Sequence, residues 1–297
     1  MSRTLSPSSN KPYGVTCVVS VWNLARSSFY AARHRQQHPQ EARKRGPKLL
    51  SDEALLIQIR QLLAAPVFPG EGYRKIWARL RFAGVRTSKE RVLRLLRENQ
   101  LLSPMRTAET ARSNPHDGTI LTEAPNQMWG TDATATFTEE DGAVTVFAAI
   151  DHCSADCVGI HAVKKATRFE ALEPIRQAVK EHFGGFCAGA AAGLQLRHDH
   201  GSVYMADHFQ SEIRFLGIES SPAFVRQPEG NGCIERFFRT LKEQLLWVRR
   251  FRDLDELRTA LSEFRERYNQ QWIMHRLGYR TPAQARREFT VEFPVAA

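Results

Sequence analysis

The sequence predicts an α/β protein in which a mixed five-stranded sheet, flanked by helices, follows an all-α N-terminal part. Before residue 103 the apolar residues recur at the three- and four-residue spacing of helices. From residue 126 onwards, short alternating or continuously apolar segments typical of strands appear. Three such segments come in succession, and helices then alternate with short strands, an order typical of a mixed sheet covered by helices.

These patterns divide the chain into five parts. They are an N-terminal helix with a basic linker (1–50), a helical domain (51–102), a linker (103–125), an α/β core (126–250) and a C-terminal helical tail (251–297). A chain of 297 residues is long enough for about two domains.

The first 102 residues are expected to be helical. The pattern predicts a short helix over residues 15–32 and a basic, proline-containing linker over 33–48. Three helices follow, the first and third capped by Ser51 and Ser88. A short connection that contains a glycine, residues 82–87, precedes the third helix, as in many helix-turn-helix motifs.

The core is expected to hold five strands and five helices with its tail. The expected strands are 131–138, 143–150, 157–163, 194–197 and 217–220, and the expected helices are 168–183, 205–216, 231–247, 253–268 and one that starts at Thr281 and Pro282. The second strand is almost continuously apolar, which predicts a central place in the sheet.

Charge is distributed unevenly along the chain. The formal net charge is +10. Residues 1–125 carry 21 Lys and Arg against 9 Asp and Glu, a net charge of +12, whereas residues 126–297 carry 21 against 23. A basic half joined to a nearly neutral half favours a nucleic-acid-binding part and a separate working part, and the alternative is a solvated basic surface.

The third helix of the helical domain carries a basic stripe. Arg91, Arg94 and Arg97 recur every three residues, so they lie on one side of the helix. Such a helix can enter the major groove of DNA, where arginines meet bases and phosphates. The alternative is a surface helix whose arginines serve solubility. The sequence therefore predicts that residues 51–102 are a helix-turn-helix DNA-binding domain.

Cysteine usage and hydropathy favour an intracellular protein. The five cysteines are an odd number, and the N-terminus lacks the apolar segment of a secretory signal. No stretch approaches the roughly 20 apolar residues of a membrane span. Cys153 and Cys157, near His152 and His161, match no usual zinc-ligand spacing, so buried thiols in strands are favoured over a zinc site.

Three acidic residues stand out by their positions. Asp132 lies in the first expected strand, Asp199 follows the fourth, and Glu235 lies one turn into a helix. Carboxylates at such places can converge at one edge of a sheet. Other acids are set aside: Asp151 is kept as a minor candidate for a fourth carboxylate, Asp207 is assigned to a helix start, and Glu139, Glu140 and Asp141 to a solvated turn.

Convergent carboxylates suit phosphodiester chemistry. In-line displacement at phosphorus places charge on an attacking and a leaving oxygen, and two Mg²⁺ ions about 3.5–4 Å apart can stabilise both. Magnesium prefers hard oxygen ligands such as carboxylates. Asp132, Asp199 and Glu235 are therefore candidate ligands of such a pair of ions.

The helix that contains Glu235 is amphipathic. Its apolar residues follow helical spacing, whereas Glu235, Arg239 and Lys242 fall on a neighbouring polar face. Glu235 can then reach a metal while Arg239 and Lys242 hold DNA phosphates. The alternative is an ordinary amphipathic helix with a Glu–Arg pair four residues apart, and this helix taken alone favours that alternative.

Taken together, the motifs resemble those of the DDE transposases related to retroviral integrases. They are Trp129-Gly130-Thr131-Asp132, Asp199-His200-Gly201-Ser202 and the segment from Asn231 to Lys242, with 35 residues between Asp199 and Glu235. The closest resemblance is to bacterial insertion-sequence transposases encoded as a small OrfA and a catalytic OrfB. Residues 71–77 and 91–99 resemble their upstream helix-turn-helix, and residues 268–269 and 277–282 their C-terminal tail.

The resemblance implies a ribonuclease-H-like core, a requirement for two Mg²⁺ or Mn²⁺ ions, and a transposase that cleaves at element ends and then performs strand transfer. Asp132, Asp199 and Glu235 match the family's catalytic triad, and Lys242 matches its basic residue seven positions after the glutamate. Arg74 and Lys75 join the expected DNA-contacting residues. Expected partners are double-stranded DNA (terminal repeats and target), the OrfA product and a second copy on paired DNA ends, with no membrane, in a cytoplasmic, nucleoid-associated protein.

This chain departs from the family pattern at three places. His198 and His200 flank Asp199, where a phosphate contact and a satisfied surface histidine both remain open. Residues 184–193 form an Ala/Gly-rich insert, and the zinc-binding His/His/Cys/Cys pattern of retroviral integrases is absent. Two other functions are kept as alternatives: a non-catalytic DNA-binding regulator, and a nuclease of the same fold.

Overall fold

The computed structural model describes residues 3–37, 50–104, 122–223 and 231–292. The chain divides into two compact units, Met1–Ala54 and Leu55–Ala297, each described by itself. No helix in these described ranges is both long enough and apolar enough to cross a membrane.

The N-terminal unit holds two helices where the sequence predicts one over 15–32. They are α1 (Gly14–Val21) and α2 (Arg26–Gln37). Asn23 adopts a left-handed conformation (φ 50°), which ends the helix because a right-handed helix cannot continue through it. The predicted linker over 33–48 is also wrong at its start, since α2 runs to Gln37, and the rest of that linker lies outside the described residues.

Three helices follow, as the sequence predicts. They are α3 (Asp52–Ala64), α4 (Tyr73–Phe82) and α5 (Lys89–Glu98). Their apolar residues are buried, among them Leu55 of α3, Ile76 of α4 and Leu96 of α5. Both predicted caps are present: the Oγ atoms of Ser51 and Ser88 each accept a backbone N–H three residues later, at 3.1 Å.

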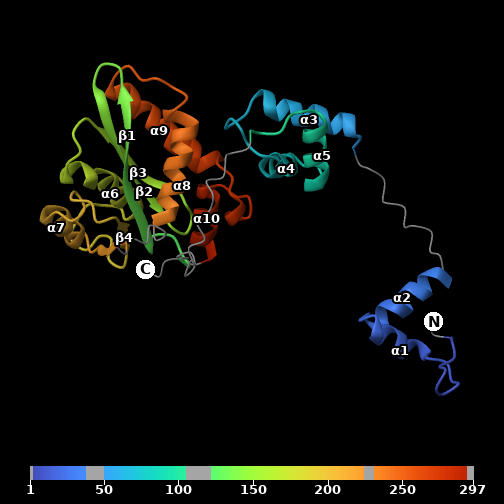
Figure 1. Ribbon diagram of the computed structural model, residues 1–297. Helices are drawn as coiled ribbons and strands as arrows, with labels where there is room; N and C mark the ends of the chain where they lie inside the picture. Colours follow the sequence, from blue (N-terminus) through green and yellow to red (C-terminus); the bar gives the residue numbers. More distant parts are fainter. Residues whose placement is uncertain (1–2, 38–49, 105–121, 224–230, 293–297) are drawn as a thin grey trace. The chain divides into compact units, whose positions relative to one another are not determined.

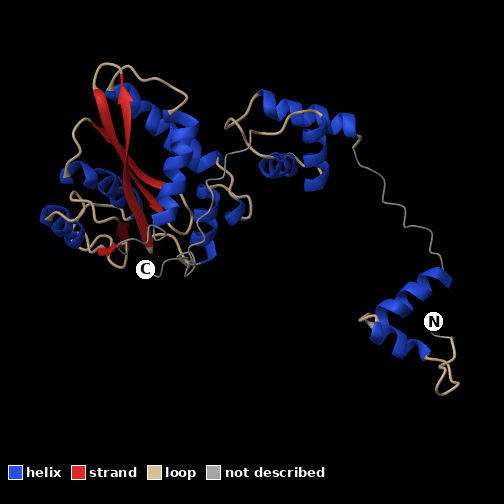
Figure 2. Ribbon diagram, in the orientation of Figure 1, coloured by secondary structure: helices blue, strands red, loops and turns tan. Residues whose placement is uncertain are grey.

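A five-stranded mixed sheet forms the centre of the second unit, as the sequence predicts (Figures 1 and 2). Its order is β3-β2-β1-β4-β5. The strands are β1 (Met128–Thr138), β2 (Gly142–Asp151), β3 (Cys157–Val163), β4 (Gln195–His198) and β5 (Glu219–Pro222). The first three pair antiparallel, and β1–β4 and β4–β5 pair parallel.

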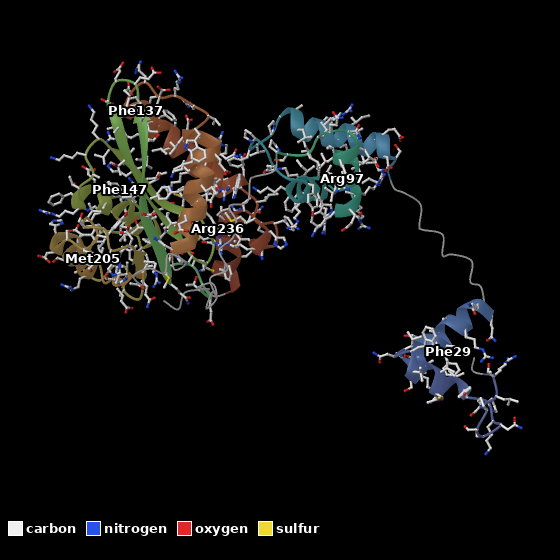
Figure 3. All side chains as sticks on the ribbon, viewed as in Figure 1. Phe29, Arg97, Phe137, Phe147, Met205 and Arg236 are labelled. Carbon is white, nitrogen blue, oxygen red and sulfur yellow. The ribbon has the colours of Figure 1, made fainter. Side chains whose placement is uncertain are left out.

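Helices cover both faces of this sheet. On one face, α8 (Gly232–Leu241) and α9 (Leu254–Gln271) pack against residues of β2 such as Ala148. On the other face, α6 (Arg168–His182) and α7 (Asp207–Phe215) pack against alternate residues of β2, including Phe147, which Figure 3 labels. Alternation of side chains along a strand therefore assigns each sheet residue to one of the two cores.

The first of these cores also holds Phe68, which lies between α3 and α4. Phe68 is fully buried, with its ring centroid 4.8 Å from that of Trp272 and 6.4 Å from that of Phe264. Edge-to-face aromatic contacts of this kind add to the apolar burial. The helical domain is thus anchored to α9 and the residue that follows it by a side chain from its own connecting loop.

The edge strand β3 is covered by side chains of α9. Arg265 donates to the carbonyl oxygens of Cys157 and Val158 at 2.8 and 2.9 Å, and Asn269 both donates to and accepts from the Cys157 backbone. An exposed strand edge is a template for unwanted pairing with another chain. Here the edge carbonyls are satisfied inside the molecule.

The long predicted helix over 231–247 changes its geometry part-way. After α8 the chain continues as a π-helix, η2 (Lys242–Leu246). A π turn inserts an extra residue per turn and occurs often at functional sites. The spacing of apolar residues does not distinguish an α-helix from a π-helix here, because Leu245 and Leu246 are adjacent and both are buried.

The C-terminal segment contains a short 3-10 turn, η3 (His275–Leu277), and α10 (Pro282–Glu292), which begins at the predicted proline. Arg286 of α10 reaches the sheet, where its Nε atom lies 2.8 Å from Asp156 and its Nη2 atom 3.3 Å from Asp151. Burial and the neighbouring Asp156 raise the pKa of Asp151, and the Arg286 charge opposes this rise.

We predict that Arg286→Leu lowers the free energy of unfolding by about 3–5 kcal/mol, because it leaves buried carboxylates without their cation. Urea unfolding followed by circular dichroism measures this loss. The matched control is Arg287→Leu, an exposed neighbour on the same helix, which should change stability by under about 0.5 kcal/mol. Equal effects of the two substitutions would contradict the role given to Arg286.

Candidate active site

The register of two parallel strands brings Asp132 and Asp199 side by side. Gly130 of β1 pairs with Arg197 of β4. Two residues beyond this pair lie Asp132 on β1 and Asp199, directly after the end of β4. Neighbouring strands run about 4.8 Å apart, and a step of two residues keeps a side chain on the same face. Asp132 and Asp199 therefore project from adjacent backbones toward one side of the sheet.

That side is the one covered by α8. Asp132 pairs with Ala148 of β2, and Ala148 belongs to the core that contains Ile234 and Phe237 of α8. Glu235 lies between these two apolar residues in sequence, on the exposed side of the helix. The helix thus buries its apolar face on the sheet and carries Glu235 at the margin nearest to the aspartates.

The start of α8 is fixed to β1 beside Asp132. Asn231 donates through Nδ2 to the Thr131 carbonyl oxygen at 3.3 Å. Gly130 makes this approach feasible, because a β-carbon there would lie 3.0 Å from Asn231 Oδ1 and 2.9 Å from His152 Nε2. A side chain at position 130 would push the helix away from the strand.

Electrostatics also place the three carboxylates in one field. The pKa of Asp132 is raised to about 6, first by burial and then by the negative charges of Asp199 and Glu235. Its own backbone neighbour works in the opposite direction, since Ala133 N–H donates to Asp132 Oδ1 at 2.7 Å. Burial likewise raises the pKa of Glu235. The negative charges of these carboxylates thus lie at a site that is partly shielded from solvent.

Lys242 supplies a positive charge to the same field. Its charge lowers the pKa of Asp132, which places the ammonium group on the site's side of the helix. Lys242 is the first residue of the π-helix η2. Arg239, one turn earlier, is exposed and pairs with Glu243 at 3.0 Å. The charge of Lys242 thus acts on Asp132, whereas the Arg239 guanidinium pairs with Glu243.

The carboxylates do not stand as a finished metal site. Within the described part of the chain, no three His, Cys, Asp or Glu side chains form a group that could hold a metal ion as they lie. The assignment of Asp132, Asp199 and Glu235 as metal ligands therefore stays a prediction. Cys153 and Cys157 are buried, as the sequence predicts, and burial raises the pKa of both thiols; Cys157 lies in β3, whereas Cys153 lies in the turn before it and not in a strand.

Most of the side chains expected to bind DNA from the helical domain are exposed to solvent. Arg94 and Arg97 are exposed on α5, Arg91 is half-buried beside them, and Arg74 is exposed on α4; Figure 3 labels Arg97. Arg94 also pairs with Glu98 at 2.9 Å.

Lys75 differs from the other expected DNA contacts. Its ammonium nitrogen lies 3.0 Å from the centroid of the Trp272 ring and 3.8 Å from Glu71. These contacts hold the lysine inside the protein, so its position does not favour a contact with DNA.

Comparisons with known proteins agree with this arrangement. A family model described as "Integrase core domain" matches residues 216–282, and one described as "HTH-like domain" matches residues 51–108. The transposase InsD for insertion element IS2A/D/F/H/I/K of Escherichia coli is 26% identical over 283 residues, which cover 93% of this chain and 92% of that protein. The chain belongs to the insertion-sequence transposases. It is a DDE-type polynucleotidyl transferase with an integrase core, and DNA is its partner.

Solved structures similar to this transposase include two viral integrases. The HTLV-2 integrase catalytic core domain in complex with magnesium (trimeric form) is 20% identical, with a TM-score of 0.41 over 55% of this chain and 98% of that chain. A simian T-cell lymphotropic virus intasome in complex with PP2A regulatory subunit B56 gamma is 16% identical, with a TM-score of 0.45 over 77% and 74%.

The two histidines beside Asp199 are now distinguished. His198 is fully buried; its Nδ1 atom lies 2.7 Å from the Asp199 carbonyl oxygen, its Nε2 atom 2.9 Å from Ser220 Oγ, and its ring stacks on Tyr204. It holds the turn that carries Asp199, and it is not a surface residue. His200 is exposed. For this transposase, a phosphate contact stays open only at His200.

Two acids that the sequence set aside have structural roles. Asp151 is fully buried and accepts the backbone N–H groups of Asn126, Cys153 and Ser154, so its carboxylate supports the local backbone. Asp141 is more than solvated, since it pairs with Lys164 at 2.7 Å and accepts the Leu254 N–H at 2.7 Å. The sequence-based view of that turn was wrong for this residue.

Two residues near the site were not predicted from the sequence: Asn231, which holds α8 to β1, and Tyr204, which lies near Asp132 and Asp199. Tyr204 is buried, and its pKa is raised by burial and then by the charges of Asp132 and Asp199. The polar Asn231 at the start of an otherwise amphipathic helix was the available signal for the first. Nothing in the spacing pointed to the second, because its place depends on how the turn after Asp199 folds.

We predict that Asp132→Asn stabilises the metal-free transposase at pH 7.5 by about 1–3 kcal/mol, since one pKa unit corresponds to about 1.4 kcal/mol. A carboxyl whose folded pKa is raised to about 6 weakens the fold progressively as pH rises from its unfolded value to about 6. The amide escapes this penalty. Urea unfolding in EDTA at several pH values measures the difference, which should vanish below pH about 4. An amide variant that is less stable at pH 7.5 would contradict the crowding of charge at Asp132.

Proposed function

We propose that this transposase cleaves DNA at the ends of an insertion sequence and joins the freed 3′ end to target DNA, with Asp132, Asp199 and Glu235 as its catalytic carboxylates. The observation that carries the proposal is the raised pKa of Asp132, to which the charges of both other carboxylates contribute. Groups with perturbed pKa values beside charged partners are candidates for catalysis.

The residues present suit a pair of divalent cations. All three donors are carboxylates; burial, and then the charges of Asp199 and Glu235, make the ionised state of Asp132 costly without a cation, and burial does the same for Glu235. Asp132 and Asp199 would hold one ion and Asp132 with Glu235 the other, with Mg²⁺ or Mn²⁺ as the matching metals. When bound, such ions stabilise the attacking and leaving oxygens of a phosphodiester displacement.

The remaining side chains would position the DNA. Lys242 lies in the field of Asp132 and offers a cation for the phosphate next to the cleaved bond. Arg239, exposed one turn away, would contact the backbone further along. The partial burial of Asp132 limits access of bulk water, which strengthens the electrostatic effect of these charges on the reacting phosphate.

Recognition of element ends would be the task of α5 and the exposed part of α4. The basic stripe of α5 consists of Arg91, Arg94 and Arg97. Arg74, which is exposed on α4, would add a further positive charge. We leave Lys75 out of this set because it packs on Trp272. The proposed domains keep the bounds predicted from sequence, 51–102 for this part and 126–250 for the core.

Larger assemblies belong to the same proposal. Two copies would act on paired DNA ends, and the product of an upstream OrfA would add recognition, in a cytoplasmic protein associated with the nucleoid. A non-catalytic regulator would not require three crowded carboxylates, and a simple nuclease would not require a separate DNA-recognition helix. Both alternatives are tested by the assays below.

We predict that Asp132→Asn abolishes Mg²⁺-dependent cleavage and joining while DNA affinity stays within about three-fold, because removal of a catalytic group spares the phosphate contacts that dominate affinity. The measurement is a strand-transfer assay with terminal-repeat DNA, next to a binding assay. Asp255→Asn, whose side chain is 90% exposed on α9, is the control and should keep full activity.

The outcomes of this assay separate the functions. Full activity of Asp132→Asn would refute the catalytic assignment. Cleavage without joining by the unaltered protein would indicate a nuclease, and binding without cleavage would indicate a regulator.

We predict that Arg94→Ala weakens binding to element ends by about five- to one-hundred-fold if it contacts a base, and that Arg91→Ala reduces the salt dependence of binding by about one unit if it contacts a phosphate. Fluorescence anisotropy over a range of salt concentrations distinguishes the two cases. Arg214→Ala, an exposed arginine on α7, is the control. Unchanged affinity and salt dependence in both α5 variants would move recognition to another part of the protein or to a partner.

A further inference from the structure

Two buried polar atoms meet above Gly130 without hydrogen-bond partners. They are Nε2 of His152 and Oδ1 of Asn231, and among the described residues neither has a partner. The two side chains are only 5% and 6% exposed. Both atoms approach the same point, since a β-carbon on Gly130 would lie 2.9 Å from His152 Nε2 and 3.0 Å from Asn231 Oδ1. Buried polar groups are rarely left unsatisfied, so this pair calls for an explanation.

The chemistry of the two atoms is complementary. Asn231 already uses its Nδ2 group to donate to the Thr131 carbonyl oxygen, and its Oδ1 atom is left as an acceptor beside Gly130. Burial, and then the charges of Arg276 and Arg197, lower the pKa of His152 to about 4, so its ring is neutral near pH 7. A neutral imidazole carries one N–H, and Nε2 is able to donate it.

The two residues differ in how firmly they are held. His152 is tied to the sheet by its backbone: its N–H donates to the Met128 carbonyl oxygen at 3.0 Å, and its own carbonyl oxygen accepts from Arg276 at 3.2 Å. Asn231 is the residue before α8 and contacts the sheet through its side chain. A hydrogen bond between them would therefore pull the start of α8 toward a fixed point on the sheet.

We propose that His152 donates a hydrogen bond from Nε2 to Asn231 Oδ1 and that this latch seats the start of α8 on β1, so that Glu235 is positioned beside Asp132. The proposal rests on the proposed function, since it gives Glu235 a catalytic task. His152 and Asn231 are positioning residues, which act through Glu235 and touch no reacting atom.

The hydrogen bond between His152 and Asn231 would act on Glu235 through the first turn of α8. Glu235 lies four residues, about one helical turn, after Asn231. The hydrogen bond would hold the start of α8 against β1 and so keep the Glu235 carboxylate on the side of the sheet where Asp132 lies. Outer residues that orient a metal ligand typically change metal affinity by about 10–100-fold when they are removed.

The test compares four variants of the full chain in the absence of DNA. His152→Leu removes the donor, His152→Gln keeps an N–H donor at a similar reach, and Asn231→Ala removes the acceptor. The matched control is His182→Leu, because His182 also has an unpartnered Nε2 but lies on α6 and packs against Trp129 on the other face of the sheet. Mn²⁺ affinity is measured by electron paramagnetic resonance, and thermal unfolding checks that each variant is folded.

We expect His152→Leu and Asn231→Ala to weaken Mn²⁺ binding by about 10-fold or more. His152→Gln should stay within about three-fold of the unaltered protein, and His182→Leu should not change it. Rescue by glutamine separates positioning from a general loss of packing, since glutamine restores the donor and not the ring. A His152→Leu variant with the same Mn²⁺ affinity as His182→Leu would overturn the latch.

A second readout does not depend on the metal. Nitrogen-15 NMR of the metal-free protein should find the His152 ring neutral at pH 7, with its proton on Nε2 in a hydrogen bond. A proton on Nδ1 would overturn the proposal, because Nε2 would then be unable to donate.

Glu235→Gln distinguishes failure of the latch from failure of the proposed function. If Glu235→Gln weakens Mn²⁺ binding and His152→Leu does not, only the latch fails. If Glu235→Gln leaves Mn²⁺ affinity unchanged, Glu235 is not a ligand, and the proposed function and the latch fail together.

Discussion

The parallel pairing of β1 with β4 sets Asp132 beside Asp199, and this register is the constraint on which the candidate site depends. Because burial, and then the charges of Asp199 and Glu235, raise the pKa of Asp132, the fold carries an electrostatic cost at neutral pH that a bound cation would remove. Burial of α8 on the same face then adds Glu235 to the field.

Much of this arrangement was predictable from sequence because local patterns decide it. The strands, the capped helices and the three acidic motifs follow from apolar periodicity, capping residues and spacing, and the mixed sheet is confirmed. Other features depend on contacts that no local pattern encodes. The break at Asn23 depends on one left-handed residue, and the π turn at Lys242 depends on how the end of α8 packs. Lys75 looked like a DNA contact until its place against Trp272 was known.

The same distinction applies to the polar residues around the carboxylates. His198 and Asp151 lie near the catalytic motifs in sequence, yet both are buried and satisfied by neighbours, so they support the backbone of the site. The sequence assigned no positioning role to His152 or Asn231, yet their polar atoms converge above Gly130. Sequence spacing proposes the ligands of a site, whereas burial and hydrogen bonding show which residues support the backbone around them.

The central claim is that three carboxylates, distant in sequence, share divalent cations. The most direct measurement is a crystal structure of the Mn²⁺-soaked protein with anomalous diffraction data. The account predicts anomalous peaks between Asp132 and Asp199 and between Asp132 and Glu235, with oxygen ligands at about 2.0–2.2 Å, as hard divalent cations of this size prefer. Mn²⁺ bound only elsewhere, with the three carboxylates left apart, would contradict it.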